Sequence, residues 1–181
     1  MKFFTPGPSE LLPTYRKYLD EAMDNNIGSI SHRGSDFEEI MQNTILKLKQ
    51  LMKIPQNYHV FFLSSANEAM ERVVQNLVET KSIHLVEGKF GEKWYKFSKG
   101  YGKEAIALSS LDSIPESDLI CVTHNETSNG LLLDLNEVYS KKNTLLAVDC
   151  TSSAPYVNLD FNYVDVALFS VQKGFGMPAG L

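Results

Sequence analysis

The most informative stretch of the sequence is residues 118–130, which read DLICVTHNETSNG. Its first part, Asp118–Thr123, is almost continuously apolar, as is typical of a β-strand whose two faces are both covered. Its second part is a dense run of polar residues that ends at Gly130, where the chain can turn. Because functional residues gather on loops that a rigid scaffold holds, the stretch predicts a buried strand with a site at its carboxyl end.

From Tyr58 onward the sequence alternates between short apolar runs and helical stretches near Ala66–Glu79 and Glu92–Gly100. The apolar runs predict strands at Tyr58–Leu63, Ser82–Val86, Glu104–Leu108, Asp118–Thr123, Thr144–Asp149 and Asp165–Ser170. No hairpin signal separates these runs. Alternation of this kind predicts an α/β fold, with a mainly parallel sheet and helices on both faces.

The first part of the chain has a different character, and we divide the sequence into an N-terminal loop and helical segment, 1–57, and a larger domain, 58–181. The segment begins with a rigid proline–glycine loop at residues 5–9. Helices are expected up to Asp24 and from a capping box at Ser35–Glu38. The last four residues form no closing helix or strand, so we expect the large domain to be incomplete.

The composition is that of an ordinary globular protein, with 43% hydrophobic residues and a formal net charge of −5. This mild acidity argues against a general nucleic-acid binder, which usually carries a basic patch. No apolar stretch reaches the roughly 18 residues of a membrane span, and the N-terminus lacks the apolar core of a signal peptide. We therefore expect a cytoplasmic protein with neither nucleic-acid nor membrane partners.

The two cysteines, Cys121 and Cys150, both stand in apolar runs and are predicted to be buried thiols. Cys121 and His124 have the spacing of a metal-ligand pair. A structural zinc site needs a second pair, and none accompanies them. We therefore predict no metal site.

Ligands of an open parallel sheet bind beyond the carboxyl ends of its strands, so polar residues at those ends are the candidates for a site. One group is residues 63–67, LSSAN, where small polar residues open a helix. Free N–H groups and the helix dipole suit a phosphate there, although the same residue types also serve as an ordinary helix cap. The glycine patterns of P-loop and Rossmann nucleotide sites are absent from the sequence.

Two charged residues also follow apolar strands. Asp149 ends one strand, where a carboxylate needs a cation or hydrogen-bond donors, or else caps the turn at residues 151–153. Lys173 follows another strand and is either a solvated surface lysine or a partly desolvated amine nucleophile. The flanking Gly174 and Gly176 favour the second interpretation, because glycines permit the close approach of a planar ligand. A phosphate cradle, a carboxylate and an amine are the three groups that pyridoxal phosphate needs.

Seven motifs carry a resemblance to a known family. They are residues 5–9 (TPGPS), 31–34 (SHRG), 65–67 (SAN), 88–91 (GKFG), 124–130 (HNETSNG), 149 (D) and 170–174 (SVQKG). With them the chain resembles the N-terminal half of a fold-type I, class V pyridoxal-phosphate aminotransferase, most like phosphoserine aminotransferases. It departs from the family in its phosphate turn, Ser64–Ala66, which lacks the usual glycines, and in the absence of the family's C-terminal parts.

The resemblance implies roles for the residues around a pyridoxal 5′-phosphate cofactor. Lys173 would be the catalytic amine that also moves a proton. Asp149 would pair with the pyridine nitrogen. Ala66 and Asn67 would hold the phosphate, with Gln172 reaching the same region.

Further roles concern the cofactor ring and the substrate. Thr127 would hydrogen-bond the cofactor. Phe90 falls where the family stacks an aromatic ring, and Trp94 is an out-of-register second choice. Arg33 resembles the arginine that binds the acidic group of the substrate, for which its bidentate fork is suited.

The activity that this resemblance implies is transamination between an amino acid and a 2-oxo acid, with phosphoserine and 2-oxoglutarate as the expected pair and serine biosynthesis as the setting. A full-length protein of this kind is expected to be a homodimer. The alternatives are alanine– or serine–glyoxylate transamination, a class V lyase and a non-catalytic module that keeps only the fold. The lyase is disfavoured because no cysteine stands on a suitable mobile loop.

Overall fold

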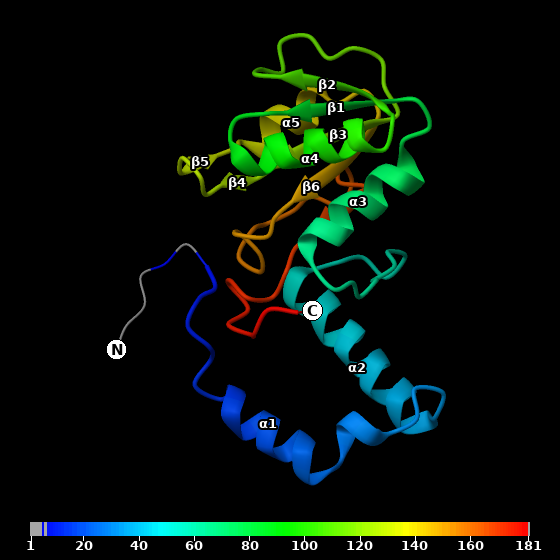
Figure 1. Ribbon diagram of the computed structural model, residues 1–181, viewed down its shortest axis with the longest axis vertical. Helices are drawn as coiled ribbons and strands as arrows, with labels where there is room; N and C mark the ends of the chain where they lie inside the picture. The colour runs from blue at the N-terminus through cyan, green and yellow to red at the C-terminus, as the bar shows by residue number, and fades with distance from the viewer. Residues whose placement is uncertain (1–4, 6, 181) are drawn as a thin grey trace.

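The computed structural model describes residue 5 and residues 7–180, so Pro6 of the N-terminal loop lies outside the described residues. A five-stranded sheet forms its centre, and every neighbouring pair of strands is parallel (Figure 1). In spatial order the strands are β2 (Glu104–Leu108), β1 (Lys81–Leu85), β3 (Leu119–Thr123), β6 (Leu145–Asp149) and β7 (Val166–Leu168). The predicted α/β class is confirmed.

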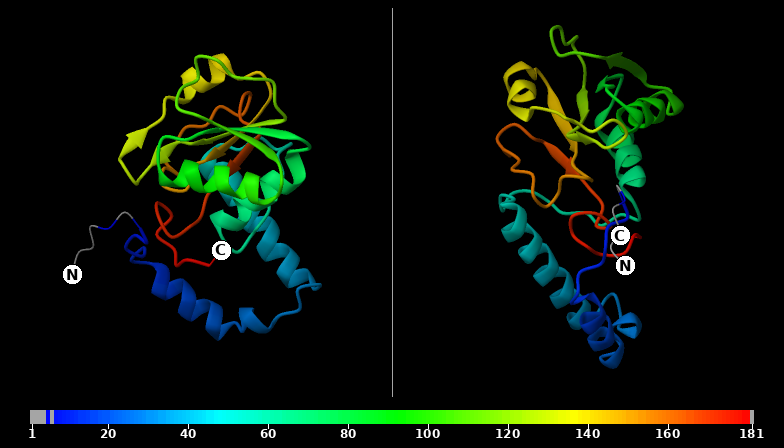
Figure 2. Two further views of the ribbon diagram at one scale, coloured as in Figure 1. Left: turned by 45° about the horizontal axis from the view of Figure 1, so that its top comes forward. Right: turned by 90° about the vertical axis from the view of Figure 1, so that its left-hand side faces the viewer.

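Helices cover both faces of the sheet, as predicted. The helices α3 (Ala66–Leu77) and α4 (Lys89–Gly100) lie on one face, and α5 (Leu135–Lys141) lies on the other (Figure 2). Along β3, Leu119 and Cys121 point into the core cluster beneath α3 and α4. The alternate residues of the strand point into the cluster on the α5 side. This double burial explains why the strand is apolar at every position.

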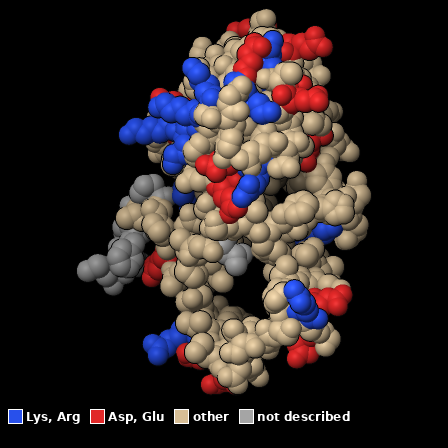
Figure 3. All heavy atoms as spheres, turned by 45° about the vertical axis from the view of Figure 1, so that its right-hand side comes forward, with Lys and Arg blue, Asp and Glu red and all other residues tan. Residues whose placement is uncertain are grey.

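The first two helices form an arm that extends away from the sheet (Figure 1). The arm consists of α1 (Tyr15–Asp24), a short 3-10 turn at Ile27–Ser29, and α2 (Ser35–Met52). No residue of α1 is buried, whereas α2 reaches the core with Met52 at its C-terminal end. Figure 3 shows open space between the arm and the rest of the molecule. The division of the chain between residues 57 and 58 stays a prediction.

Two predictions about strands are wrong. Tyr58–Leu63 is irregular, and among the described residues none of its backbone groups joins a strand. A strand needs a neighbouring strand for its hydrogen bonds, and within the described residues this segment pairs with no strand of the sheet. Phe61 is 81% exposed. The second wrong prediction is the absence of a hairpin. A small one is present, in which β4 (Asn125–Glu126) pairs antiparallel with β5 (Leu131–Leu132).

Helix starts also differ from the predictions. The helix α2 begins at Ser35 with Gly34 at its N-cap, and within the described chain no side chain caps it. The expected capping box does not form, because the Ser35 hydroxyl donates to Asp36 instead. The helix α4 begins at Lys89, three residues before the predicted start. Among the residues described, no helix combines the length and the apolar character needed to cross a membrane.

Candidate functional site

A cavity of about 320 Å³ lies at the carboxyl ends of β3, β6 and β7, next to the N-terminus of α3. All seven residues that the sequence assigns to the cofactor line this cavity: Ala66, Asn67, Phe90, Thr127, Asp149, Gln172 and Lys173. It is lined as well by Gly7, Pro8, Ser65, Met70, Lys93, Thr123, Asn125, Thr151, Ser152, Ser170 and Ala179. The parallel sheet has therefore brought segments from the whole length of the chain to one place.

One end of the cavity is the N-terminus of α3. Ser65 is the N-cap, and its hydroxyl accepts a hydrogen bond from the backbone N–H of Glu68 at 3.2 Å. Helix geometry leaves the N–H groups of Ala66 and Asn67 without intrahelical acceptors. The carboxylate of Glu68 points back to Ser64, whose N–H and hydroxyl donate to it at 2.9 and 2.7 Å. The side-chain cap considered for this motif therefore forms, and the free N–H groups of Ala66 and Asn67 leave phosphate binding as a prediction.

The carboxylate of Asp149 lies at the end of β6 and is 4% exposed. Its Oδ1 accepts a hydrogen bond from the backbone N–H of Thr151 at 2.9 Å. Burial raises the pKa of Asp149, while the hydrogen bond from the Thr151 N–H and the positive charge of Lys173 act in the opposite direction. Asp149 is therefore both the cap of its turn and an incompletely compensated carboxylate on the cavity wall.

Three hydroxyl groups on the cavity wall have no hydrogen-bond partner within the described part of the chain. They belong to Thr123, Thr151 and Ser170. Leaving a buried hydroxyl unpaired costs about 1–3 kcal/mol, so their gathering around one cavity indicates a place for a polar ligand. None of the three is predicted from the sequence as a site residue, although each lies at or just beyond the end of a predicted strand.

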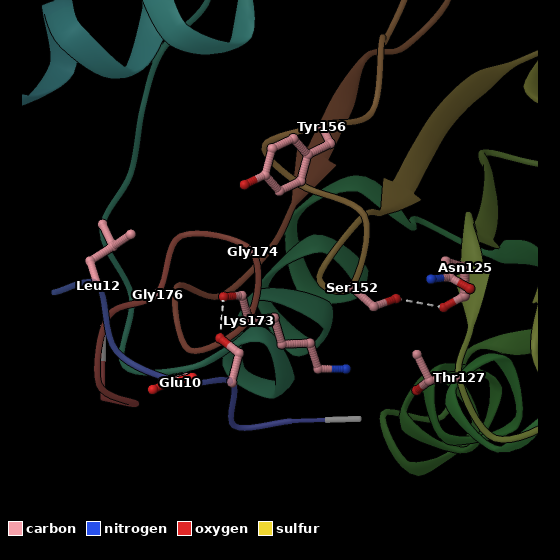
Figure 4. A pocket seen from close by; sticks show the side chains of 10 residues that line it. Glu10, Leu12, Asn125, Thr127, Ser152, Tyr156, Lys173, Gly174 and Gly176 are labelled. Atoms are coloured by element: carbon pink, nitrogen blue, oxygen red, sulfur yellow. Dashed lines mark hydrogen bonds between the residues drawn. The ribbon is translucent and has the colours of Figure 1, made fainter. Parts of the chain in front are cut away.

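The loop that carries Lys173 is held by the N-terminal loop of the chain. The backbone N–H of Ser9 donates to the carbonyl of Gln172 at 2.8 Å, and the Ser9 hydroxyl donates to the carbonyl of Lys173 at 2.5 Å. The Lys173 side chain points toward Thr127, and its Nζ lies 5.5 Å from the centroid of the Phe90 ring (Figure 4). A wider cavity of about 510 Å³ adjoins the first and also reaches Lys173.

The structure gives a different reason for the glycine at position 174 from the predicted close approach of a ligand. A Cβ atom at Gly174 would overlap the carbonyl oxygen of Ala154. The glycine therefore lets two loops of this chain pass close together, and close approach of a ligand is not needed to explain it. Gly174 and Gly176 line only the wider cavity.

The two aromatic candidates are separated by the structure. Phe90 lines the cavity. Trp94 is 1% exposed in the core, where its indole N–H donates to the carbonyl of Met70 at 3.2 Å. Lys93 also lines the cavity, with its Nζ 5.9 Å from the Phe90 ring centroid. Its position three residues after Phe90, on the same side of a helix, is a signal that the sequence analysis did not use.

Arg33 is not brought to the cavity. It lies in the exposed loop before α2 and lines neither the cavity at the strand ends nor the wider cavity beside it. His124 is also outside them, and its Nδ1 lies 2.7 Å from the Ser153 hydroxyl. Both cysteines are buried free thiols, as predicted.

Comparisons with known proteins agree with this geometry. Residues 4–87 match the family model described as aminotransferase class-V. An uncharacterized aminotransferase of Methanocaldococcus jannaschii is 31% identical over 97% of this chain and 49% of its own length. The crystal structure of a phosphoserine aminotransferase from Cytophaga hutchinsonii superposes with a TM-score of 0.94 at 41% identity, over 99% of this chain and 54% of that one. The chain is thus similar to class-V aminotransferases over almost its whole length.

Within the class-V aminotransferases, the chain is similar to phosphoserine aminotransferases. That of Rhodococcus opacus is 29% identical over 98% of this chain and 50% of its own length. The chain thus spans about half the length of the curated relatives it matches. The family implies pyridoxal 5′-phosphate as the cofactor, and the residues present fit it: a free helix N-terminus, a buried carboxylate, an amine and three unpartnered hydroxyls share one cavity.

Proposed function

We propose that the whole protein is a pyridoxal-phosphate-dependent aminotransferase that moves an amino group between phosphoserine and 2-oxoglutarate. The observation that carries the proposal is the meeting of the Lys173 amine, the Asp149 carboxylate and the N-terminus of α3 around one cavity. Similarity to phosphoserine aminotransferases supports the choice of substrate pair. The remaining half of the protein completes the substrate site in this proposal.

The cofactor, when bound, supplies an electron sink for the carbanion that forms at the substrate α-carbon. In the proposal, the N–H groups of Ala66 and Asn67 bind its phosphate, helped by the dipole of α3 and by the Gln172 side chain. The carboxylate of Asp149 holds a proton on the pyridine nitrogen. That pairing gives the buried carboxylate the cationic partner that burial demands.

The other cavity residues bind, orient and move protons. Lys173 Nζ would hold the cofactor and, when free of it, would take up and return the proton of the substrate α-carbon. Thr127 orients the ring through its hydroxyl. The ring of Phe90 packs against the cofactor and keeps water from that side.

Arg33 remains the proposed ligand of the substrate's acidic group, but it cannot serve the site of its own chain from where it lies. We therefore place it across the interface of a homodimer. Exposed apolar residues on α1 support that assembly, since Tyr18, Leu19 and Met23 are 59%, 45% and 71% exposed. The two free buried thiols are in keeping with a reducing compartment, and the proposal locates the protein in the cytoplasm.

A substrate panel on the whole protein tests the proposal. We expect kcat/KM for phosphoserine with 2-oxoglutarate to exceed that for alanine or serine with glyoxylate, together with a visible absorbance band from the lysine-bound cofactor. Brisk turnover of alanine or serine on glyoxylate without phosphoserine activity would identify a glyoxylate aminotransferase instead. A colourless protein that binds no pyridoxal phosphate would identify a non-catalytic module.

A further inference from the structure

The N-terminus of α4 is capped by a loop that lies almost forty residues later in the sequence. Its N-cap residue, Gly88, has no side chain to offer. Instead, the N–H of Phe90 donates to Glu126 Oε2 at 2.9 Å, and the N–H of Gly91 donates to the same oxygen at 3.2 Å. The N–H of Lys89 donates to the Ser128 hydroxyl at 3.0 Å. Three free N–H groups of the helix are thus paired by Glu126 and Ser128, which we call the Glu126 clamp.

Glu126 is held as an anion inside the molecule, where it is 2% exposed. Its second oxygen, Oε1, accepts the N–H of Ser128 at 3.2 Å and the Ser128 hydroxyl at 2.5 Å. Burial pushes the pKa of Glu126 upward, but the hydrogen bonds from Ser128, Gly91 and Phe90 outweigh it and bring the pKa below its ordinary value. A buried carboxylate with four donors is a rigid attachment point.

Gly88 and Glu126 are matched to each other. A Cβ atom at Gly88 would overlap the Glu126 side chain, so only glycine leaves room for the carboxylate at the helix end. The Glu126 clamp can therefore form only because the N-cap of α4 is a glycine.

Neighbouring residues of the polar motif at 124–130 face different parts of the molecule. Asn125 and Thr127 line the cavity, whereas Glu126 and Ser128 bind α4. Asn125 and Glu126 lie on β4, where successive side chains point to opposite sides, and Thr127 and Ser128 lie in the turn that follows. The carboxylate of Glu126 therefore links two parts of the cavity wall, Thr127 on its own segment and Phe90 on α4.

We propose that Glu126 is a positioning residue, which fixes the Phe90 ring against the cofactor and in register with Thr127. The proposal rests on the proposed function for the identity of the ligand. Replacing Glu126 by Gln leaves one acceptor oxygen and puts an NH₂ donor where an oxygen now accepts two hydrogen bonds. Loss of a charge-assisted hydrogen bond at a buried site predicts a rise of about tenfold in the dissociation constant of pyridoxal phosphate.

A double-mutant cycle separates positioning from a general structural role. In the whole protein, the dissociation constant and the visible circular dichroism of bound pyridoxal phosphate are measured for wild type, Glu126→Gln, Phe90→Leu and the double variant. When Phe90 is present, we expect Glu126→Gln to raise the dissociation constant about tenfold and to alter the dichroism. In the Phe90→Leu background, we expect Glu126→Gln to raise the dissociation constant by less than about twofold. Equal rises in both backgrounds, or none in either, would overturn the proposal. Glu87→Gln, a carboxylate outside the cavity and the clamp, is the matched control.

Amide hydrogen exchange in the cofactor-free protein gives an independent readout. The amides of Phe90 and Gly91 should be protected in wild type and exchange faster in Glu126→Gln. Unchanged exchange would contradict the clamp whatever the cofactor does. If Glu126→Gln does not fold, Ser128→Ala replaces it in the same cycle, with the same two outcomes. A wild-type protein that binds no pyridoxal phosphate would overturn the proposed function, and the exchange data would still decide whether the clamp exists.

Discussion

At the scale of single residues, Asp149 carries the most specific chemistry of the cavity. Its carboxylate is buried beside Lys173, and the Thr151 N–H binds only one of its oxygens. We expect Asp149→Asn to leave the cofactor bound and to lower kcat by about 100-fold, because an amide cannot hold the pyridine proton electrostatically. Steady-state kinetics and cofactor titration measure the two effects. Asp112→Asn, at an exposed position, is the control. Near-normal turnover of Asp149→Asn would show that Asp149 only caps its turn.

In the proposed function, attachment of the cofactor depends on Lys173. We expect Lys173→Ala to abolish both the visible absorbance band of the lysine-bound cofactor and transamination, because the Lys173 amine lies in the cavity near Asp149 and points toward Thr127 (Figure 4). Lys96→Ala, in an exposed ion pair with Glu92, should change neither. Full turnover with an unchanged band in Lys173→Ala would refute the assignment.

The sequence predicted residues that line the cavity where charged side chains follow the ends of apolar strands. Asp149 and Lys173 were found because a charge after an apolar strand is unusual and needs a reason. Thr151 and Ser170 were missed because hydroxyl residues are common in loops. Only the structure reveals that their hydroxyls are buried without partners.

At the scale of elements, β1 and α4 enclose a buried polar cluster with a titratable centre. His84 is 1% exposed, and its Nε2 lies 3.0 Å from the Ser82 hydroxyl and 2.9 Å from that of Ser98. Burial lowers the pKa of His84 from its ordinary value of 6.5 to about 4. The imidazole is therefore neutral in the folded protein at neutral pH.

The expected consequence is a loss of stability in mild acid. Between pH 6.5 and 4 the unfolded chain binds a proton at His84 that the folded chain does not, so the free energy of unfolding falls as the pH falls through this window. The shift corresponds to about 3 kcal/mol. Denaturant unfolding across the window should show a shallower pH dependence for His84→Asn than for wild type, and His59→Asn, at an exposed position, should retain the full slope. Equal slopes for all three proteins would contradict the assignment.

Elements were predictable where their signals are local. The strands β3 and β6 are apolar at nearly every position because both of their faces are covered, and the sequence displays that directly. The start of α4 was placed three residues too late because its cap, Glu126, is remote in sequence. Tyr58–Leu63 has the composition of a strand, but strand formation depends on a free neighbouring edge, which composition does not encode.

At the scale of the whole molecule, the position of Arg33 leads to a test by mixed dimers. We expect Arg33→Ala to lower kcat/KM for phosphoserine by about tenfold to a hundredfold, and to affect alanine much less. Dimers that combine an Arg33→Ala chain with a Lys173→Ala chain should regain about half of the wild-type activity, since one site then holds both residues. Mixed dimers that stay as inactive as their parents would show that Arg33 does not act across an interface. An equal loss for phosphoserine and alanine would indicate a general carboxylate or folding role.

The hydrogen bonds between Ser9 and the Lys173 loop join residues 164 positions apart. During synthesis the loop that carries Ser9 leaves the ribosome long before the Lys173 loop. It cannot form these hydrogen bonds until the intervening strands of the sheet have been made. Residues translated early are thus among the last to reach their final place, which makes completion of the cavity a late event in the maturation of the nascent chain.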